Sequence, residues 1–232
     1  TISYLDLFPR SPERAKIMEG LIAAEPNLDA KISQLKIWLN APQFALSAGD
    51  EIKLRELRAA IAQKLADKDA ASAVVATPVI VEEMTALIAK GGAKVREYRY
   101  VRARAEYAQK NFAVAAPEFA ELAKFETTPD HFAVQSQNLL LDIYNQQKDL
   151  AKIVSQSKLW TENESLKKNP KFASELKEMA QVAEQASFEN ATAQGESLDS
   201  LAVFFSYCQN GKFLPKSCEN AKILSIKLNQ HA

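Results

Sequence analysis

Apolar side chains recur every three or four residues along most of the chain, which is the spacing of one face of an α-helix. Leu54, Leu57, Ile61 and Leu65 are a clear example. No stretch alternates apolar and polar residues as a half-buried strand does. The predicted fold class is therefore all-α, with about eleven helices. They are expected over residues 12–24, 28–40, 50–67, 78–90, 93–109, 113–126, 129–147, 150–163, 170–188, 198–209 and 217–229.

Prolines mark several helix starts. A capping residue precedes proline in Ser11-Pro12, Thr77-Pro78, Thr128-Pro129 and Asn169-Pro170. Since proline is favoured at the first helical position, we expect a helix to begin at Pro78. Residues 68–76 are then a linker or a frayed helix end. Gly91-Gly92 can supply a left-handed cap where the helix that begins at Pro78 ends.

The composition is typical of a folded, helix-rich protein. The 232 residues are 47% hydrophobic and 25% charged, and only 6 are glycine. Lys+Arg 29 balances Asp+Glu 29, which argues against nucleic-acid binding driven by bulk electrostatics. No continuous apolar run reaches the roughly 18 residues of a membrane span, so no membrane insertion is expected.

Two segments of the chain align with each other, at an offset of 37 residues before a turn and 38 after it. In each, a tyrosine closes a first helix, a bulky apolar residue occupies the turn and a second helix follows. Neither hairpin can bury its wide apolar face alone, so neighbouring hairpins are expected to stack. The aligned positions are Tyr100, Ala103, Tyr107, Phe112, Ala115 and Phe119 in the first segment, and Gln137, Leu140, Tyr144, Leu150, Ile153 and Ser157 in the second.

The pattern resembles the tetratricopeptide repeat. Tyr100, Ala103 and Tyr107 fit its first helix, and Ala115 and Phe119 fit its second, although Arg104 occupies a position usually held by a small residue. The resemblance implies a right-handed superhelix of antiparallel helical hairpins; another α-solenoid of hairpins is the rival. One continuous solenoid would then comprise a tail (1–10), N-terminal hairpins (11–92), tetratricopeptide-like repeats (93–197) and a capping hairpin (198–232).

In tetratricopeptide domains the first helix of each repeat lines a concave groove that binds a partner. The resemblance places Asn138, Asp142 and Asn145 there, on one helical face, where amides can bond to a peptide backbone. The alternative is a solvated face with no ligand. The full set of groove residues that the resemblance implies is Gln135, Asn138, Asp142 and Asn145 in the second repeat segment, and Tyr98, Val101, Ala105, Ala108 and Gln109 in the first.

A basic cluster is the strongest charge feature. It consists of Lys90, Lys94, Arg96, Arg99, Arg102 and Arg104. The favoured interpretation is a solvated face whose charges pair with Glu118 and Glu121 on the next helix. Binding of an acidic partner segment, and less so of nucleic acid, remain as alternatives.

The only cysteines, Cys208 and Cys218, flank a turn between two apolar periodic segments. A disulfide between them would close a loop of about 11 residues and contribute roughly 2.8 kcal/mol. Such a bond implies an oxidising compartment, and hence a periplasmic or secreted location. Two small buried thiols, which would allow a cytoplasmic location, are the alternative.

Few features of the sequence indicate a catalytic site. His131 is expected to be exposed in a first helical turn, and His231 is in the tail; neither has neighbours at metal-ligand spacing. No glycine-rich phosphate loop is present. Glu164-Ser165 and Glu196-Ser197 resemble the Glu-Ser pair of lytic transglycosylases, but that family's later motifs are missing. No metal or cofactor is expected.

The expected function is a non-enzymatic protein–protein interaction scaffold, which the resemblance and the cysteines suggest belongs to a bacterial envelope assembly. The expected partner is a peptide or helix of another protein. A second copy of the chain is a further candidate, through apolar surface at Phe8, Phe44 and Trp160, although core packing explains these residues equally well. The alternatives are a helical helper domain of a larger enzyme and a cell-wall-active enzyme.

Overall fold

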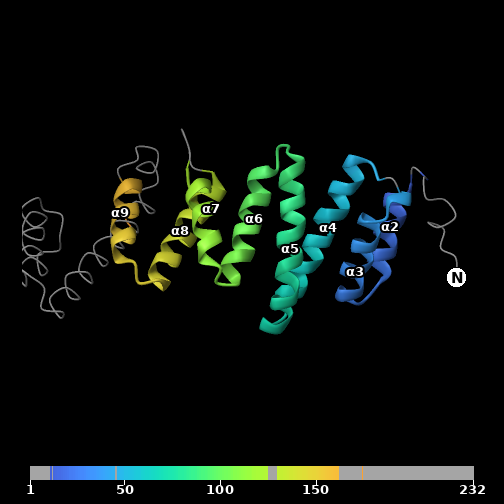
Figure 1. Ribbon diagram of the computed structural model, residues 1–232, viewed down its shortest axis with the longest axis horizontal. Coiled ribbons are helices and arrows are strands. Elements are labelled where there is room, and N and C mark those ends of the chain that lie inside the picture. Colours follow the sequence, from blue (N-terminus) through green and yellow to red (C-terminus); the bar gives the residue numbers. More distant parts are fainter. Residues whose placement is uncertain (1–10, 12, 45, 125–129, 162–173, 175–232) are drawn as a thin grey trace, which may run out of the picture. The chain divides into compact units, whose positions relative to one another are not determined.

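Figure 1 shows a computed structural model of the chain. The structure describes residues 11, 13–44, 46–124, 130–161 and 174. Within these residues it has eight α-helices, one short 3-10 helix and no strand, so the predicted all-α class is confirmed there. The tail (1–10), the helices predicted over 170–188, 198–209 and 217–229, and both cysteines lie outside the described residues.

The helix pattern of the sequence corresponds one to one with the eight helices. Side-chain oxygens of Asn27, Ser47 and Asp130 accept a backbone N–H and cap three of the starts. The helices are α2 (Arg14–Ala24), α3 (Leu28–Leu39), α4 (Ala48–Ala66), α5 (Ala70–Lys90), α6 (Val95–Ala108), α7 (Phe112–Leu122), α8 (His131–Gln146) and α9 (Leu150–Thr161), with the 3-10 helix η1 (Pro42–Phe44) after α3.

The predicted linker over 68–76 is wrong. Helix α5 begins at Ala70, where the Asp69 carboxylate accepts the Ser72 N–H, and Pro78 lies inside the helix. Proline cannot donate to the carbonyl one turn back. The Thr77 hydroxyl, expected to cap a helix start, instead donates to the Ala73 carbonyl within α5 at 2.8 Å. Helix α5 packs against α4 and α6, and core residues lie on both sides of Pro78, with Ala76 before it and Ile80 after it. This packing outweighs the preference of proline for a helix start.

The chain forms two compact units, residues 1–122 and 123–232. In the first unit α3 packs on α4, α4 on α5, α5 on α6 and α6 on α7; in the second α8 packs on α9. Connections of three to four residues join α4 to α5, α5 to α6 and α6 to α7, so these neighbours are antiparallel (Figure 1). The buried core of the first unit includes Met18, Leu35, Trp38, Leu54 and Leu87.

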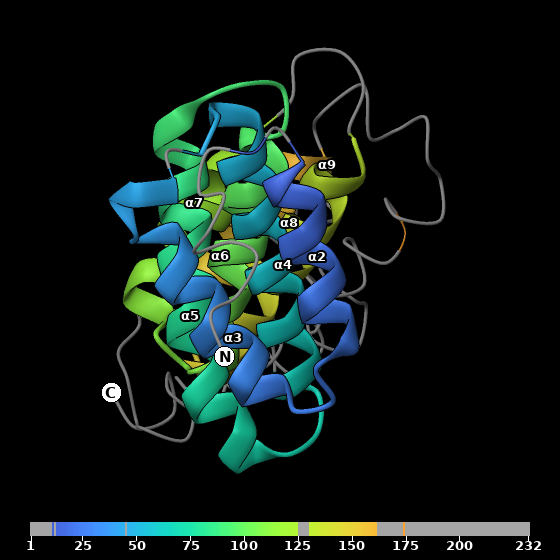
Figure 2. The ribbon, with the colours of Figure 1, turned by 90° about the vertical axis from the view of Figure 1, so that its right-hand side faces the viewer.

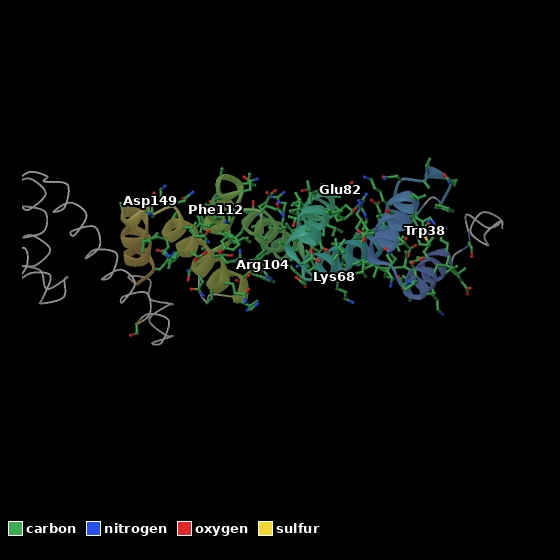
Figure 3. The ribbon with its side chains drawn as sticks, turned by 90° about the horizontal axis from the view of Figure 1, so that it is seen from below. Trp38, Lys68, Glu82, Arg104, Phe112 and Asp149 are labelled. Atoms are coloured by element: carbon green, nitrogen blue, oxygen red, sulfur yellow. The ribbon has the colours of Figure 1, made fainter. Side chains whose placement is uncertain are left out.

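Helices α4 and α5, of 19 and 21 residues, are longer than α3 and α6, of 12 and 14. The hairpin of α4 and α5 therefore extends beyond the ends of its neighbours, as the teal segment at the bottom of Figure 2 shows. Lys68 lies in the turn at its tip (Figure 3). Because α5 is long, it offers a long surface against which both α4 and α6 pack.

The turns after α6 and after α8 have the same geometry. Lys110 and Lys148, 38 residues apart, both adopt a φ of 58°. In the first turn the N–H of Lys110 bonds to the Tyr107 carbonyl at 2.8 Å; in the second the N–H of Lys148 bonds to the Asn145 carbonyl at 3.0 Å. The next N–H in each turn reaches back five residues, to Glu106 and Tyr144. The hydrogen bonds thus repeat at an offset of 38 residues.

Among the described helices, α5 alone has the length and hydropathy to cross a membrane. Core helices of soluble proteins often have both properties. Here Ala76, Ile80 and Leu87 of α5 are buried in the core of the first unit, and the Glu83 carboxylate pairs with arginines of α4.

Candidate functional site

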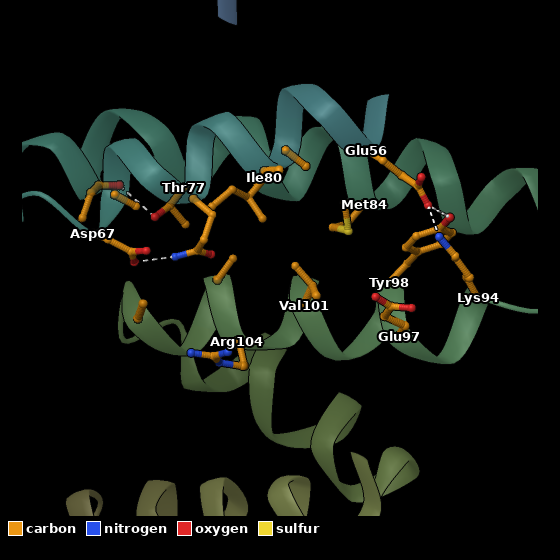
Figure 4. A pocket seen from close by; sticks show the side chains of 17 residues that line it. Glu56, Asp67, Thr77, Ile80, Met84, Lys94, Glu97, Tyr98, Val101 and Arg104 are labelled. Carbon is orange, nitrogen blue, oxygen red and sulfur yellow. Dashed lines mark hydrogen bonds and ion pairs between the residues drawn. The ribbon is translucent and has the colours of Figure 1, made fainter. Parts of the chain in front are cut away.

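A groove with a volume of about 640 Å³ lies between α4 and α6, over α5 (Figure 4). We call it the α4–α6 groove. Ile80 and Met84 of α5 lie almost completely buried at its bottom, and half-buried Val101 of α6 adds apolar surface. Six alanines make up much of the remaining lining: Ala59, Ala60 and Ala66 from α4, Ala73 from α5, and Ala105 and Ala108 from α6. Their short side chains leave the space open.

A hydrogen-bonded cluster of Glu56, Lys94 and Tyr98 closes one end of the groove. The Tyr98 hydroxyl donates to Glu56 Oε1 at 2.6 Å, and Lys94 Nζ lies 2.9 Å from the same oxygen. The cluster joins α4 to the start of α6. Glu97, one position before Tyr98, exposes its carboxylate at this end (Figure 4). The two carboxylates and one ammonium make this end net negative.

These contacts shift the pKa values of the cluster. The hydrogen bond from Tyr98, followed by that from Lys94, lowers the pKa of the Glu56 carboxyl below its ordinary 4.5. Burial, with the hydrogen bond to Glu56, raises the pKa of the Tyr98 hydroxyl. The hydrogen bond to Glu56 raises the pKa of the Lys94 ammonium. The cluster is therefore held as carboxylate, phenol and ammonium at neutral pH.

The opposite end of the groove carries Gln63, Asp67, Thr77 and Arg104 (Figure 4). Gln63 Nε2 donates to Asp67 Oδ1 at 2.8 Å. The Arg104 guanidinium is exposed and lies 5.9 Å from the centre of the Tyr100 ring. This end thus presents one carboxylate and one guanidinium.

A buried ion network joins α3, α4 and α5 in the first unit. Arg58 and Glu83 are 2% and 1% exposed and form an ion pair, and Arg55 Nη1 lies 2.8 Å from Glu83 Oε2. Arg58 Nε also donates to the Ile32 carbonyl of α3 at 3.3 Å. Neither Arg58 nor Glu83 lines the α4–α6 groove. The network aligns the three helices.

The sequence interpretation missed this network, although a signal was present. Glu83 continues the apolar stripe of α5, three residues after Ile80 and four before Leu87, and all three are buried. A carboxylate in an apolar stripe needs a buried cation. Arg55 and Arg58, one turn apart on α4, are in place to supply it.

The binding residues expected on α6 gather at the α4–α6 groove. Tyr98, Val101, Ala105 and Ala108 line it. Tyr98 is only 6% exposed and its hydroxyl is bonded to Glu56, so it holds the wall together. Gln109 follows the end of α6 and donates to the Ala73 carbonyl at 3.3 Å.

The residues expected on α8 belong to the second unit. Asn138 and Asn145 are exposed on α8, while Gln135 and Asp142 are half-buried. Asp142 Oδ2 accepts a hydrogen bond of 2.6 Å from Gln146 Nε2 on the same helix. Asn138, Asp142 and Asn145 thus form a polar stripe on α8, and none of the three lines the α4–α6 groove.

Most of the basic cluster is engaged within the first unit. Glu118 of α7 pairs with Arg99 and, at 3.1 Å, with Arg102. The predicted pairing with Glu118 is confirmed. Arg96 Nη2 donates to the Leu122 carbonyl at 2.5 Å, and Lys90 Nζ lies 2.7 Å from Glu51 Oε2.

The described residues offer no group of three His, Cys, Asp or Glu side chains placed to hold a metal ion. His131 is exposed at the start of α8, as predicted, and its ring contacts Phe132. Phe44 and Trp160, expected either to seed dimers or to pack in a core, are 5% and 6% exposed.

Comparison with known proteins found no match among family models, curated proteins or solved structures.

Proposed function

We propose that the protein is a non-enzymatic interaction scaffold that binds a segment of a partner protein in the α4–α6 groove. The observation that carries the proposal is an open groove of about 640 Å³ with an apolar bottom and charged ends. Concave apolar surface with a few polar groups is the usual form of a recognition site. The polar stripe of Asn138, Asp142 and Asn145 is the second candidate surface.

A tetratricopeptide-like solenoid is the finer fold that we propose. Its support is the identical turn geometry at Lys110 and Lys148, 38 residues apart. The groove adds support, since two helices line it while the helix between them lies beneath. Such an arrangement suits repeated hairpins, which offer successive first helices to one surface.

An assembly of the bacterial envelope is the proposed setting. This part of the proposal rests on the sequence alone, on Cys208 and Cys218 and their proposed disulfide. A thiol count on the denatured, unreduced protein tests it: two free thiols would remove the argument for an oxidising compartment.

Affinity capture with a groove-blocking variant tests the binding proposal. Ala60→Arg introduces a long side chain at an exposed alanine of the groove wall. Ala89→Arg makes the same change at an exposed position of α5 outside the groove. Arginine is a good helix former, so both variants should keep their helices. The immobilised wild type and variants are compared in an extract of cells that produce the protein, with mass spectrometry of the retained proteins.

A partner retained by the wild type and by Ala89→Arg but lost by Ala60→Arg supports the groove. A partner retained by all three but lost by the triple variant Asn138→Ala/Asp142→Ala/Asn145→Ala moves the site to α8. A partner retained equally by every variant contradicts both surfaces.

A further inference from the structure

We infer that the ligand of the α4–α6 groove is an amphipathic α-helix that has a basic residue in contact with Glu97. The inference rests on the proposed function, because it specifies the chemistry of the partner in that groove. Three observations carry it: the groove's length, the state of its polar groups and the charge at its ends.

The length of the groove suits a short helical stripe. From Glu56 to Asp67 on α4 the groove spans about 16 Å, at 1.5 Å per residue. About eleven residues of a bound helix cover that distance and present three or four apolar side chains on one face. Val101 and the alanine walls offer these side chains an apolar surface.

The polar groups of the groove leave few hydrogen-bond partners for the backbone of an extended peptide. A strand of the same length has about five residues, each with a backbone N–H and C=O to satisfy. Tyr98 and Lys94 already bond to Glu56, Gln63 Nε2 bonds to Asp67, and the Thr77 hydroxyl bonds to the Ala73 carbonyl. A helix satisfies its own backbone, so it can lie on alanine-rich walls without such partners.

Charge fixes the remaining feature of the ligand. Lys94 is paired with Glu56, which leaves the exposed Glu97 carboxylate as the excess charge at this end. At the other end Arg104 and Asp67 balance each other. A ligand lysine or arginine that reaches Glu97 therefore complements the groove, whereas an acidic residue there is repelled.

Selection from two displayed peptide libraries tests the inference on the full 232-residue chain. One library holds helix-forming 16-residue peptides with a randomised stripe at every third and fourth position. The other holds extended peptides of eight residues rich in proline and β-branched residues. Binders are then measured against the wild type, the groove variant Ala60→Arg and its control Ala89→Arg.

The expected winners come from the helical library, carry a basic residue at one end of the stripe and lose about tenfold or more in affinity to Ala60→Arg. Glu97→Lys should weaken them about three- to tenfold. Glu82→Gln, which removes an exposed carboxylate of α5 outside the groove, should leave the affinity unchanged.

Two results would overturn the inference in different ways. Groove-dependent binders that are extended, or that are indifferent to Glu97→Lys, remove the basic helix and leave the proposed function standing. If no binder from either library distinguishes Ala60→Arg from Ala89→Arg, the groove does not bind peptide segments, and the proposed function fails together with the inference.

Discussion

At the scale of single residues, Glu83 is a buried carboxylate that joins two arginines in the first unit. Its carboxylate contacts Arg55 and the buried Arg58. Glu83→Gln should lower the free energy of unfolding by about 3–5 kcal/mol, because it removes the buried charge partner of Arg58 and leaves the buried guanidinium only the half-exposed Glu82. Urea unfolding followed by circular dichroism measures the loss.

Its neighbour Glu82 is a matched control. Glu82 also pairs with Arg58, at 3.0 Å, but its side chain is 49% exposed. Glu82→Gln should therefore cost no more than about 1 kcal/mol. Equal losses for the two variants would contradict the buried network.

The Glu56 cluster predicts a part of the pH dependence of stability. The pKa of Glu56 is lowered in the folded state by Tyr98 and Lys94, below its ordinary 4.5. Its stabilising contribution is therefore complete well above pH 4.5 and is lost as the pH falls through the lower, folded-state pKa. Glu56→Gln should be less stable than the wild type at pH 7, with the difference shrinking on acidification. Urea midpoints between pH 7 and pH 3 measure it.

Glu106 provides the control for this pH dependence. It is a carboxylate of α6 that accepts a hydrogen bond from Asn111 just beyond the end of the same helix. For Glu106→Gln we expect a smaller loss of stability at pH 7, because only this local contact is removed. A Glu56→Gln difference that stayed constant down to pH 3 would contradict the assigned contacts.

At the scale of elements, the chain's periodicity predicted the described helices and all but one of their starts, whereas the helix expected over 113–126 ends at Leu122. Apolar spacing indicates which residues face a core, and seven predicted helix starts lie within two residues of the observed starts. The start of α5 was missed because Thr77-Pro78 has the sequence of a helix start. The competing cap, Asp69 three residues before Ser72, is the one that the structure uses. Neither local preference reveals that packing carries α5 through Pro78.

The turn after α6 contains one residue, Lys110, whose replacement by glycine is expected to stabilise the protein. Lys110 adopts a φ of 58°, a left-handed conformation that glycine accepts at no steric cost. Lys110→Gly should therefore raise the free energy of unfolding by about 0.5–1 kcal/mol. Thermal and urea unfolding measure the gain.

Gln109, the residue before, is the control. Its φ of −84° is one that any residue adopts, and its side chain donates an exposed hydrogen bond to the Ala73 carbonyl. Gln109→Gly therefore gains nothing from glycine and should cost at least about 0.5–1 kcal/mol. A loss of stability with Lys110→Gly would show that the turn does not have the described geometry.

At the scale of the whole molecule, the candidate site depends on what lies between helices. The sequence placed Tyr98, Val101, Ala105 and Ala108 on one face of α6, and they line the groove. It did not identify the opposite wall, because α4 shows no repeat pattern of its own. The contribution of Glu56 depends on the register of α4 against α6, which no local pattern specifies.

The α4–α6 groove is the proposed binding site of the protein, and site-specific photocrosslinking tests it most directly. A photoreactive amino acid is placed at Gln63, which lines the groove, or at Lys64, the next residue, which is exposed outside it. Cells that produce the protein are irradiated and the crosslinked products are identified by mass spectrometry. We expect a partner segment to be crosslinked from position 63 and not from position 64, and the crosslink to be lost when Ala60→Arg is added. Equal products from both positions, or a product from 63 that survives Ala60→Arg, would contradict it.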